Sequence, residues 1–187
     1  MNIFVGCASR LPQNIEFIEL AKDIGYYISS GKHNLVFGGY DGGLMGKVCS
    51  IVNKSKTSDI IIATCEAYKE EVENNALANK KIYVAKTVCE RKDMFFKLAD
   101  VLVFLPGGIG TIDELSSAIE AKRCGEHNLP IIIINQDGFF DYYLSMLNKI
   151  YADGFADSKS RKLYIVVNDF SEAFGPLETI ALLNKNK

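Results

Sequence analysis

The fold is decided by one stretch of the sequence, residues 101–114, which reads VLVFLPGGIGTIDE. Its first five residues are all apolar, which predicts a strand at 101–105 that is buried on both faces of a parallel sheet. Pro106 and three glycines then predict a tight turn, and the pattern from residue 112 onward predicts a helix. A buried strand that passes through a glycine-rich turn into a helix is the repeating unit of parallel α/β sheets.

The same unit recurs along the whole chain. Six further apolar runs predict strands at residues 3–5, 35–37, 60–63, 82–85, 131–134 and 164–167. Helical patterns follow the seven strands at residues 14–30, 44–52, 66–78, 91–98, 112–123, 139–152 and 171–183. No linker, repeat or low-complexity stretch divides them. We therefore predict a single α/β domain over residues 1–187, with a doubly wound, Rossmann-like parallel sheet and helices on both faces.

Composition excludes several classes of protein. Hydrophobic residues make up 48% of the chain and charged residues 24%, which supports a full core and excludes disorder. The net charge of −2 provides no basic field for nucleic acid. The apolar runs are too short to cross a bilayer, and Gly6 interrupts the first of them, so we expect neither a membrane span nor a signal peptide. We expect a cytoplasmic protein that binds neither nucleic acid nor membrane.

Cysteine and histidine spacing gives no support for a metal site. The five cysteines contain no CxxC pair, and the two histidines, His33 and His127, lie far apart in the sequence. Structural zinc sites need clustered thiolate or imidazole ligands. We therefore expect reduced, mostly buried thiols and no bound metal.

Three small-residue loops follow predicted strands, at residues 6–9, 38–46 and 106–111. Because ligands of such sheets bind at the carboxyl ends of the strands, these loops are the candidate site. Glycines let backbone N–H groups approach an anion, and a helix N-terminus adds unpaired donors. The candidate phosphate- or substrate-binding residues of the loops are Ser9, Gly38, Gly39, Gly43, Gly107, Gly108, Gly110 and Thr111. The alternative is that residues 106–114 form only a tight turn and a capped helix.

Arg91 and Glu114 are the candidate catalytic pair. One helix and one strand separate them, so the chain can return both side chains to one cleft. A guanidinium can grip phosphate or sugar oxygens, and a carboxylate can stabilise a developing sugar cation or orient water. Lys92 joins the candidate substrate-binding residues. The alternative is a solvated helix start with a surface ion pair.

Two common nucleotide-binding motifs do not fit. In a Walker A reading of residues 41–48, Asp41 stands in place of the first glycine and Val48 in place of the magnesium-binding Ser or Thr. The dinucleotide fingerprint fails because Asp113 stands where the third glycine is required. ATP hydrolysis and nicotinamide binding are therefore disfavoured.

Three motifs together resemble the LOG ("Lonely guy") family of cytokinin riboside 5'-monophosphate phosphoribohydrolases, also described as "possible lysine decarboxylase". The family's PGGxGTxxE motif matches residues 106–114, its GGGxxGLMG motif matches residues 38–46, and its HxRK segment matches residues 89–92. The resemblance extends over nearly the whole chain. Four features depart from the family: Tyr40 replaces a glycine, Cys89 a histidine and Asp113 a glutamate, and residues 64–71 lack a Pro-Arg-Glu stretch.

The resemblance implies an enzyme that hydrolyses the N-glycosidic bond of a nucleoside 5'-monophosphate and needs no cofactor. Its substrate is AMP or an N6-substituted AMP (a cytokinin nucleotide), and its products are the free base and ribose 5-phosphate. Arg91 and Glu114 fall on the family's catalytic residues, and residues 107–111 fall on its phosphate loop. The resemblance also implies a homodimer with the active site near the subunit boundary.

Other functions stay open at this point. A non-catalytic nucleotide or molybdopterin carrier would need the phosphate loop but not a placed carboxylate. A lysine decarboxylase would need pyridoxal phosphate on a Schiff-base lysine, and nothing around Lys47, Lys92 or Lys97 indicates one. A nucleoside deoxyribosyltransferase would transfer the sugar to a second base instead of water.

Overall fold

A computed structural model describes residues 1–185 of the chain, so Asn186 and Lys187 of the predicted domain lie outside the described residues. The strands are β1 (Asn2–Gly6), β2 (Asn34–Phe37), β3 (Ile60–Cys65), β4 (Lys80–Ala85), β5 (Val101–Phe104), β6 (Ile131–Ile134) and β7 (Ile165–Val167). The α-helices are α1 (Ile15–Ser30), α2 (Gly43–Ser55), α3 (Lys69–Glu73), α4 (Val88–Leu98), α5 (Ile109–Arg123), α6 (Asp141–Ala152) and α7 (Phe170–Lys185). Short 3-10 turns lie at Glu66–Tyr68, Gln136–Gly138 and Ser158–Leu163.

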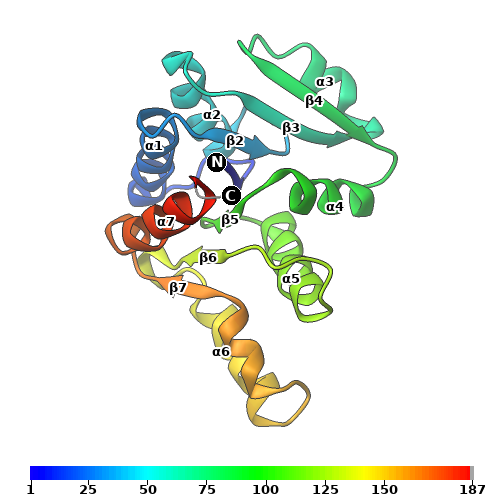
Figure 1. Cartoon of the computed structure of the whole chain (residues 1–187), viewed down its shortest axis with the longest axis vertical. Helices are drawn as coiled ribbons and strands as arrows, with labels where there is room; N and C mark the ends of the chain where they lie inside the picture. Colours follow the sequence, from blue (N-terminus) through cyan, green and yellow to red (C-terminus); the bar gives the residue numbers. More distant parts are fainter. Residues whose placement is uncertain (186–187) are drawn as a thin grey trace.

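All seven strands form one parallel sheet in the order β4-β3-β2-β1-β5-β6-β7. The chain builds outward from β1 to β4, then returns to the other side of β1 and continues with β5 to β7 (Figure 1). The direction of winding therefore reverses between β1 and β5. In sheets of this kind the reversal opens a crevice at the carboxyl ends of the strands, where ligands bind. The predicted doubly wound α/β fold is confirmed.

Helices cover both faces of the sheet, and each face has its own core. On one face, Ile3 and Val5 of β1 pack with α1, α2 and α7. On the other, Phe4 packs with Phe95 of α4 and Leu115 of α5. This alternation follows from the two-residue period of a strand, which sends successive side chains to opposite faces. Figure 1 shows α1 and α7 on one side of the sheet and α4 and α5 on the other.

The predicted helices differ from the observed ones at their ends, and three of these differences affect the candidate site. The helices predicted to begin at residues 91 and 112 begin three residues earlier, at Val88 and Ile109. The sequence predicts a loop at Gly110, but the residue lies in the first turn of α5, which tolerates glycine because its N–H groups have no intrahelical partner. The helix predicted over residues 66–78 is reduced to a 3-10 turn and the five-residue α3.

Within residues 1–185, no helix is both long enough and apolar enough to cross a bilayer. The same residues contain no group of three His, Cys, Asp or Glu side chains that could hold a metal ion. All five cysteines are free, and three of them, Cys7, Cys49 and Cys65, are buried.

Candidate active site

A cavity of about 600 Å³ opens at the carboxyl ends of the central strands. It lies where β1 and β5 reverse the winding, and the loops after β1, β2, β3 and β5 all contribute to its wall, together with the start of α4. This volume is within the range of small-molecule sites. The lining residues are Cys7, Ala8, Ser9, Arg10, Gly38, Tyr40, Met45, Tyr68, Glu71, Val72, Val88, Arg91, Gly108, Ile109, Gly110, Thr111 and Glu114.

The N-terminus of α5 faces this cavity without a side-chain cap. Gly108 is its N-cap residue and provides no side-chain oxygen, whereas Asn14 caps α1 and Thr87 caps α4. The first N–H groups of a helix have no intrahelical partners and carry the positive end of the helix dipole. Because Gly108, Gly110 and Thr111 line the cavity, the first turn of α5 can bind an anion such as phosphate.

The glycine loop before α2 has a different role. Gly43 has a left-handed φ of 60°, and a Cβ there would collide with the backbone of Ser9 and Arg10. The N–H groups of Leu44 and Met45 donate to the carbonyl oxygen of Ala8, at 3.0 and 3.2 Å. The N-terminus of α2 is therefore capped by the loop after β1, and it holds that loop at the wall of the cavity.

Arg91 and Glu114 meet at this site. The Arg91 Nη2 atom donates to Glu114 Oε1 at 3.0 Å, and the two side chains are 17% and 8% exposed. The guanidinium also lies 5.5 Å from the centre of the Phe95 ring, close enough for a cation–π contact. The Arg91 Nε atom is buried without a hydrogen-bond partner among the described residues. This guanidinium therefore keeps donors that are not used within the protein.

Burial raises the pKa of Glu114 to about 7. The Arg91 guanidinium counteracts this rise, Asp113 reinforces it and Lys92 opposes it more weakly. Cys7 lies close enough for the Glu114 charge to add to the effect of burial, which raises the pKa of the Cys7 thiol well above its usual value. A carboxylate in such a water-poor place interacts strongly with any positive charge that develops beside it.

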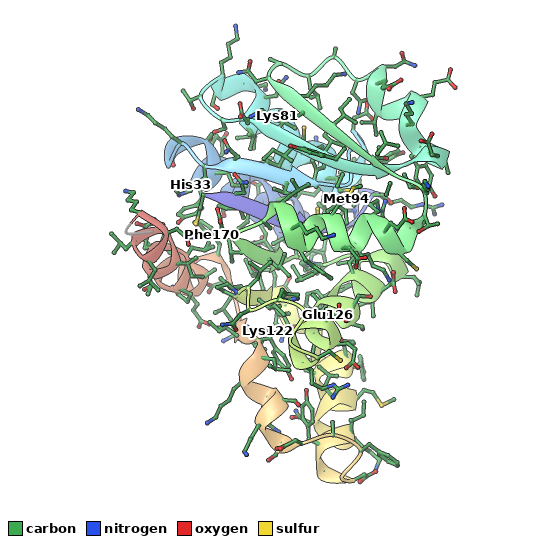
Figure 2. All side chains as sticks on the ribbon, turned by 45° about the vertical axis from the view of Figure 1, so that its right-hand side comes forward. His33, Lys81, Met94, Lys122, Glu126 and Phe170 are labelled. Atoms are coloured by element: carbon green, nitrogen blue, oxygen red, sulfur yellow. The ribbon has the colours of Figure 1, made fainter. Side chains whose placement is uncertain are left out.

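Lys92 points to a second acidic residue. Its Nζ atom donates to both carboxylate oxygens of Asp113, each at 3.0 Å, and to the hydroxyl of Ser117 at 2.9 Å. Lys92 does not line the cavity. It connects α4 to α5 instead, and Figure 2 shows α4, labelled at Met94, lying next to α5, which carries Lys122 near its C-terminal end.

The structure brings most of the predicted site residues together. Seven of them line the cavity: Ser9, Gly38, Arg91, Gly108, Gly110, Thr111 and Glu114. Gly39, Gly43, Lys92 and Gly107 lie outside it. Gly107 is instead packed against Thr111, and a Cβ at Gly107 would collide with the Thr111 side chain.

Sequence reasoning did not select the wall formed by Tyr68, Glu71, Val72 and Val88. The three residues after β3 could have been found from their place in the fold, because β3 ends beside β2 at the same edge of the sheet. Val88 was missed because α4 begins earlier than the sequence predicted.

Known proteins resemble this chain in sequence and in fold. A family model described as "Possible lysine decarboxylase" matches residues 45–177. A probable cytokinin riboside 5'-monophosphate phosphoribohydrolase, LOG4, from Oryza sativa subsp. japonica is 33% identical over 96% of this chain and 77% of its own length. A cytokinin riboside 5'-monophosphate phosphoribohydrolase from Mycobacterium tuberculosis is 30% identical over 91% of this chain and 90% of its own length.

Solved structures share the fold at lower sequence identity. The molybdenum cofactor carrier protein of Chlamydomonas reinhardtii superposes with a TM-score of 0.68 at 17% identity, over 97% of this chain and 98% of that one. The molybdenum cofactor binding protein of Rippkaea orientalis gives a TM-score of 0.66 at 16% identity, over 96% of this chain and 95% of that one. These likenesses concern the fold alone. The sequence matches, by contrast, show the family. This chain belongs to the LOG family, whose family model carries the description "Possible lysine decarboxylase".

Proposed function

We propose that this protein hydrolyses the N-glycosidic bond of a nucleoside 5'-monophosphate, giving the free base and ribose 5-phosphate. The observation that carries the proposal is the Arg91–Glu114 pair, joined at 3.0 Å in the same cavity as the uncapped N-terminus of α5. A carrier needs an anion site but has no use for a buried carboxylate beside it. The names of the relatives from rice and Mycobacterium tuberculosis support the same reaction.

The order of the strands suggests how a nucleotide lies in the cavity. The phosphate binds at the first turn of α5, which follows β5. The sugar lies over β1 and β2, where Arg91 approaches Gly38 and contacts Glu114. The base lies towards the end of β3, beside Tyr68 and Val72. Three strand spacings separate β5 from β3, or roughly 14 Å, which suits an extended nucleotide.

In this arrangement Glu114 acts in its ionised form. As the bond between C1' and the base nitrogen breaks, its electron pair leaves with the base, and C1' acquires positive charge that the Glu114 carboxylate stabilises. The oxygen of a water molecule then bonds to C1'. Of the two protons of that water, one stays on the new hydroxyl group and the other balances the proton taken up by the departing base. Arg91 orients the substrate and favours the ionised form of Glu114.

The base end of the cavity is mostly apolar. Its wall is formed by Tyr40, Tyr68, Glu71, Val72 and Val88, of which two are aromatic and one is charged. Tyrosine rings can lie against the flat face of any base. The names of the relatives specify cytokinin riboside 5'-monophosphates, and on this ground we propose AMP or an N6-substituted AMP as the substrate. The expected homodimer and cytoplasmic location are proposals as well. Ile109, which is 88% exposed at the cavity wall, is a candidate for contact with a second subunit.

The test is a substrate panel. Purified protein is incubated with AMP, N6-isopentenyl-AMP, GMP and CMP, and the released base is measured by chromatography. We expect adenine or its N6-substituted form to be released faster than guanine or cytosine. A second set of reactions contains a different free base, because sugar transfer to it would identify a transferase. Nucleotide binding without release of any base would contradict the proposal and favour the carrier.

A further inference from the structure

Two ion pairs lie side by side between α4 and α5. Arg91 and Lys92 are neighbours on α4, and their partners Glu114 and Asp113 are neighbours on α5. The Lys92 side chain is only 15% exposed, whereas that of Asp113 is 50% exposed. A mostly buried ammonium group needs compensating partners. Asp113 and Ser117 provide them.

The donors of Lys92 are fully used within the protein. An ammonium group has three N–H donors, and its three acceptors here are the two Asp113 carboxylate oxygens and the Ser117 hydroxyl. Arg91 differs, because it has one hydrogen bond to Glu114 and a buried Nε atom without a partner. Arg91, which lines the cavity, is thus held by fewer hydrogen bonds than its neighbour Lys92.

We propose that Lys92 and Asp113 are positioning residues: their ion pair fixes α4 against α5, so that the Arg91 guanidinium meets the Glu114 carboxylate at the cavity. This inference rests on the proposed hydrolase function. It also assigns Lys92 a role other than direct contact with the substrate phosphate. Glu114 is faced by Arg91 and Lys92 from α4, by Asp113 from its own helix and by Cys7 from the loop after β1.

Removing either member breaks the same ion pair, so the positioning role predicts a loss of activity in both variants. Lys92→Met and Asp113→Asn should each lower kcat for AMP roughly tenfold with KM little changed, because Arg91 is no longer held in one geometry against Glu114. A direct charge effect would act in opposite directions, since Lys92 favours the ionised Glu114 carboxylate and Asp113 disfavours it. The rates are therefore compared at about pH 9, where Glu114 is ionised in every variant.

Three control variants complete the design. Lys92→Arg keeps the charge and can keep the ion pair, and we expect a kcat close to that of the wild type. Glu120→Gln and Arg123→Met each break the exposed ion pair near the other end of α5, and we expect both to leave kcat unchanged because that pair does not hold α4 against α5. Circular dichroism and thermal melting verify that each variant is folded.

The proposal fails if either substitution leaves kcat at the wild-type value, or if Asp113→Asn raises it. It also fails if Lys92→Met raises KM for AMP tenfold or more with an unchanged kcat, because Lys92 would then be a phosphate ligand. NMR measurement of hydrogen exchange at the buried Arg91 Nε atom tests the placement of Arg91 without turnover, and we expect faster exchange in both variants than in the wild type. If the wild type releases no base, the hydrolase proposal fails, and this exchange measurement still decides the role of the ion pair.

Discussion

The carboxyl group of Glu114 is buried and also contacts a cationic partner, the Arg91 guanidinium. Burial alone favours the neutral acid, and the Arg91 guanidinium at 3.0 Å favours the carboxylate. The net result is a pKa of about 7, above the ordinary value of 4.5. Both protonation states of Glu114 are thus accessible near neutral pH, and the pH dependence of the reaction can show which of them is active.

We expect kcat/KM to follow the ionised form of Glu114. Because the folded-state pKa is raised to about 7, the carboxylate predominates above that pH and is lost below it. The logarithm of kcat/KM should therefore rise with a slope of about one below pH 7 and level off above it. Initial rates with AMP across this range provide the measurement. Activity that increases as the pH falls through 7 would instead identify the neutral carboxylic acid as the active form.

The first turn of α5 offers a test of phosphate binding that does not perturb the fold. A Cβ at Gly110 meets no atom within 4 Å, and alanine is a better helix former than glycine. Gly110→Ala should melt no lower than the wild type. Because Gly110 lines the cavity, its added methyl group should compete with a phosphate, and ribose 5-phosphate should raise the melting temperature of the variant less than that of the wild type. Equal stabilisation of both proteins would place the phosphate elsewhere.

The contact between α2 and the loop after β1 predicts a stability effect. Gly43→Ala places a Cβ against the backbone of Ser9 and Arg10 and adds the cost of a left-handed φ. Gly125→Ala has the same left-handed backbone, with a φ of 81°, but meets no atom within 4 Å. We expect a loss of roughly 1 kcal/mol for Gly125→Ala and of at least about 3 kcal/mol for Gly43→Ala. Urea denaturation measures both, and equal losses would contradict the close packing.

Individual elements differ in how well the sequence predicts them. The strands were found because runs such as 131–134 contain only isoleucine and are buried on both faces. The sequence predicts the starts of α4 and α5 three residues too late, because the pattern alone does not show that Thr87 caps α4 or that Gly110 lies in the first turn of α5. The helix expected over residues 66–78 is mostly absent, since only Val72 of α3 is buried and little packing supports it.

Across the whole molecule, the site depends on contacts that no single motif contains. The sequence predicted that Arg91 and Glu114 could meet, because one helix and one strand separate them. It could not predict that Lys92 contacts Asp113 and Ser117, since that depends on how α4 packs on α5. The part of the cavity wall formed by Tyr68, Glu71 and Val72 likewise depends on β3 lying beside β2. The position of the crevice, by contrast, follows from the topology of the fold.

The central claim is that Glu114 promotes cleavage of the glycosidic bond, and one comparison tests it most directly. Glu114→Gln and Glu120→Gln make the same chemical change on the same helix, one in the cavity and one in an exposed ion pair. The measurement is an NMR time course of AMP hydrolysis that follows adenine and ribose 5-phosphate together. We predict equal amounts of the two products from the wild type and Glu120→Gln, and a rate at least about 100-fold lower for Glu114→Gln. Undiminished turnover by Glu114→Gln would contradict the account.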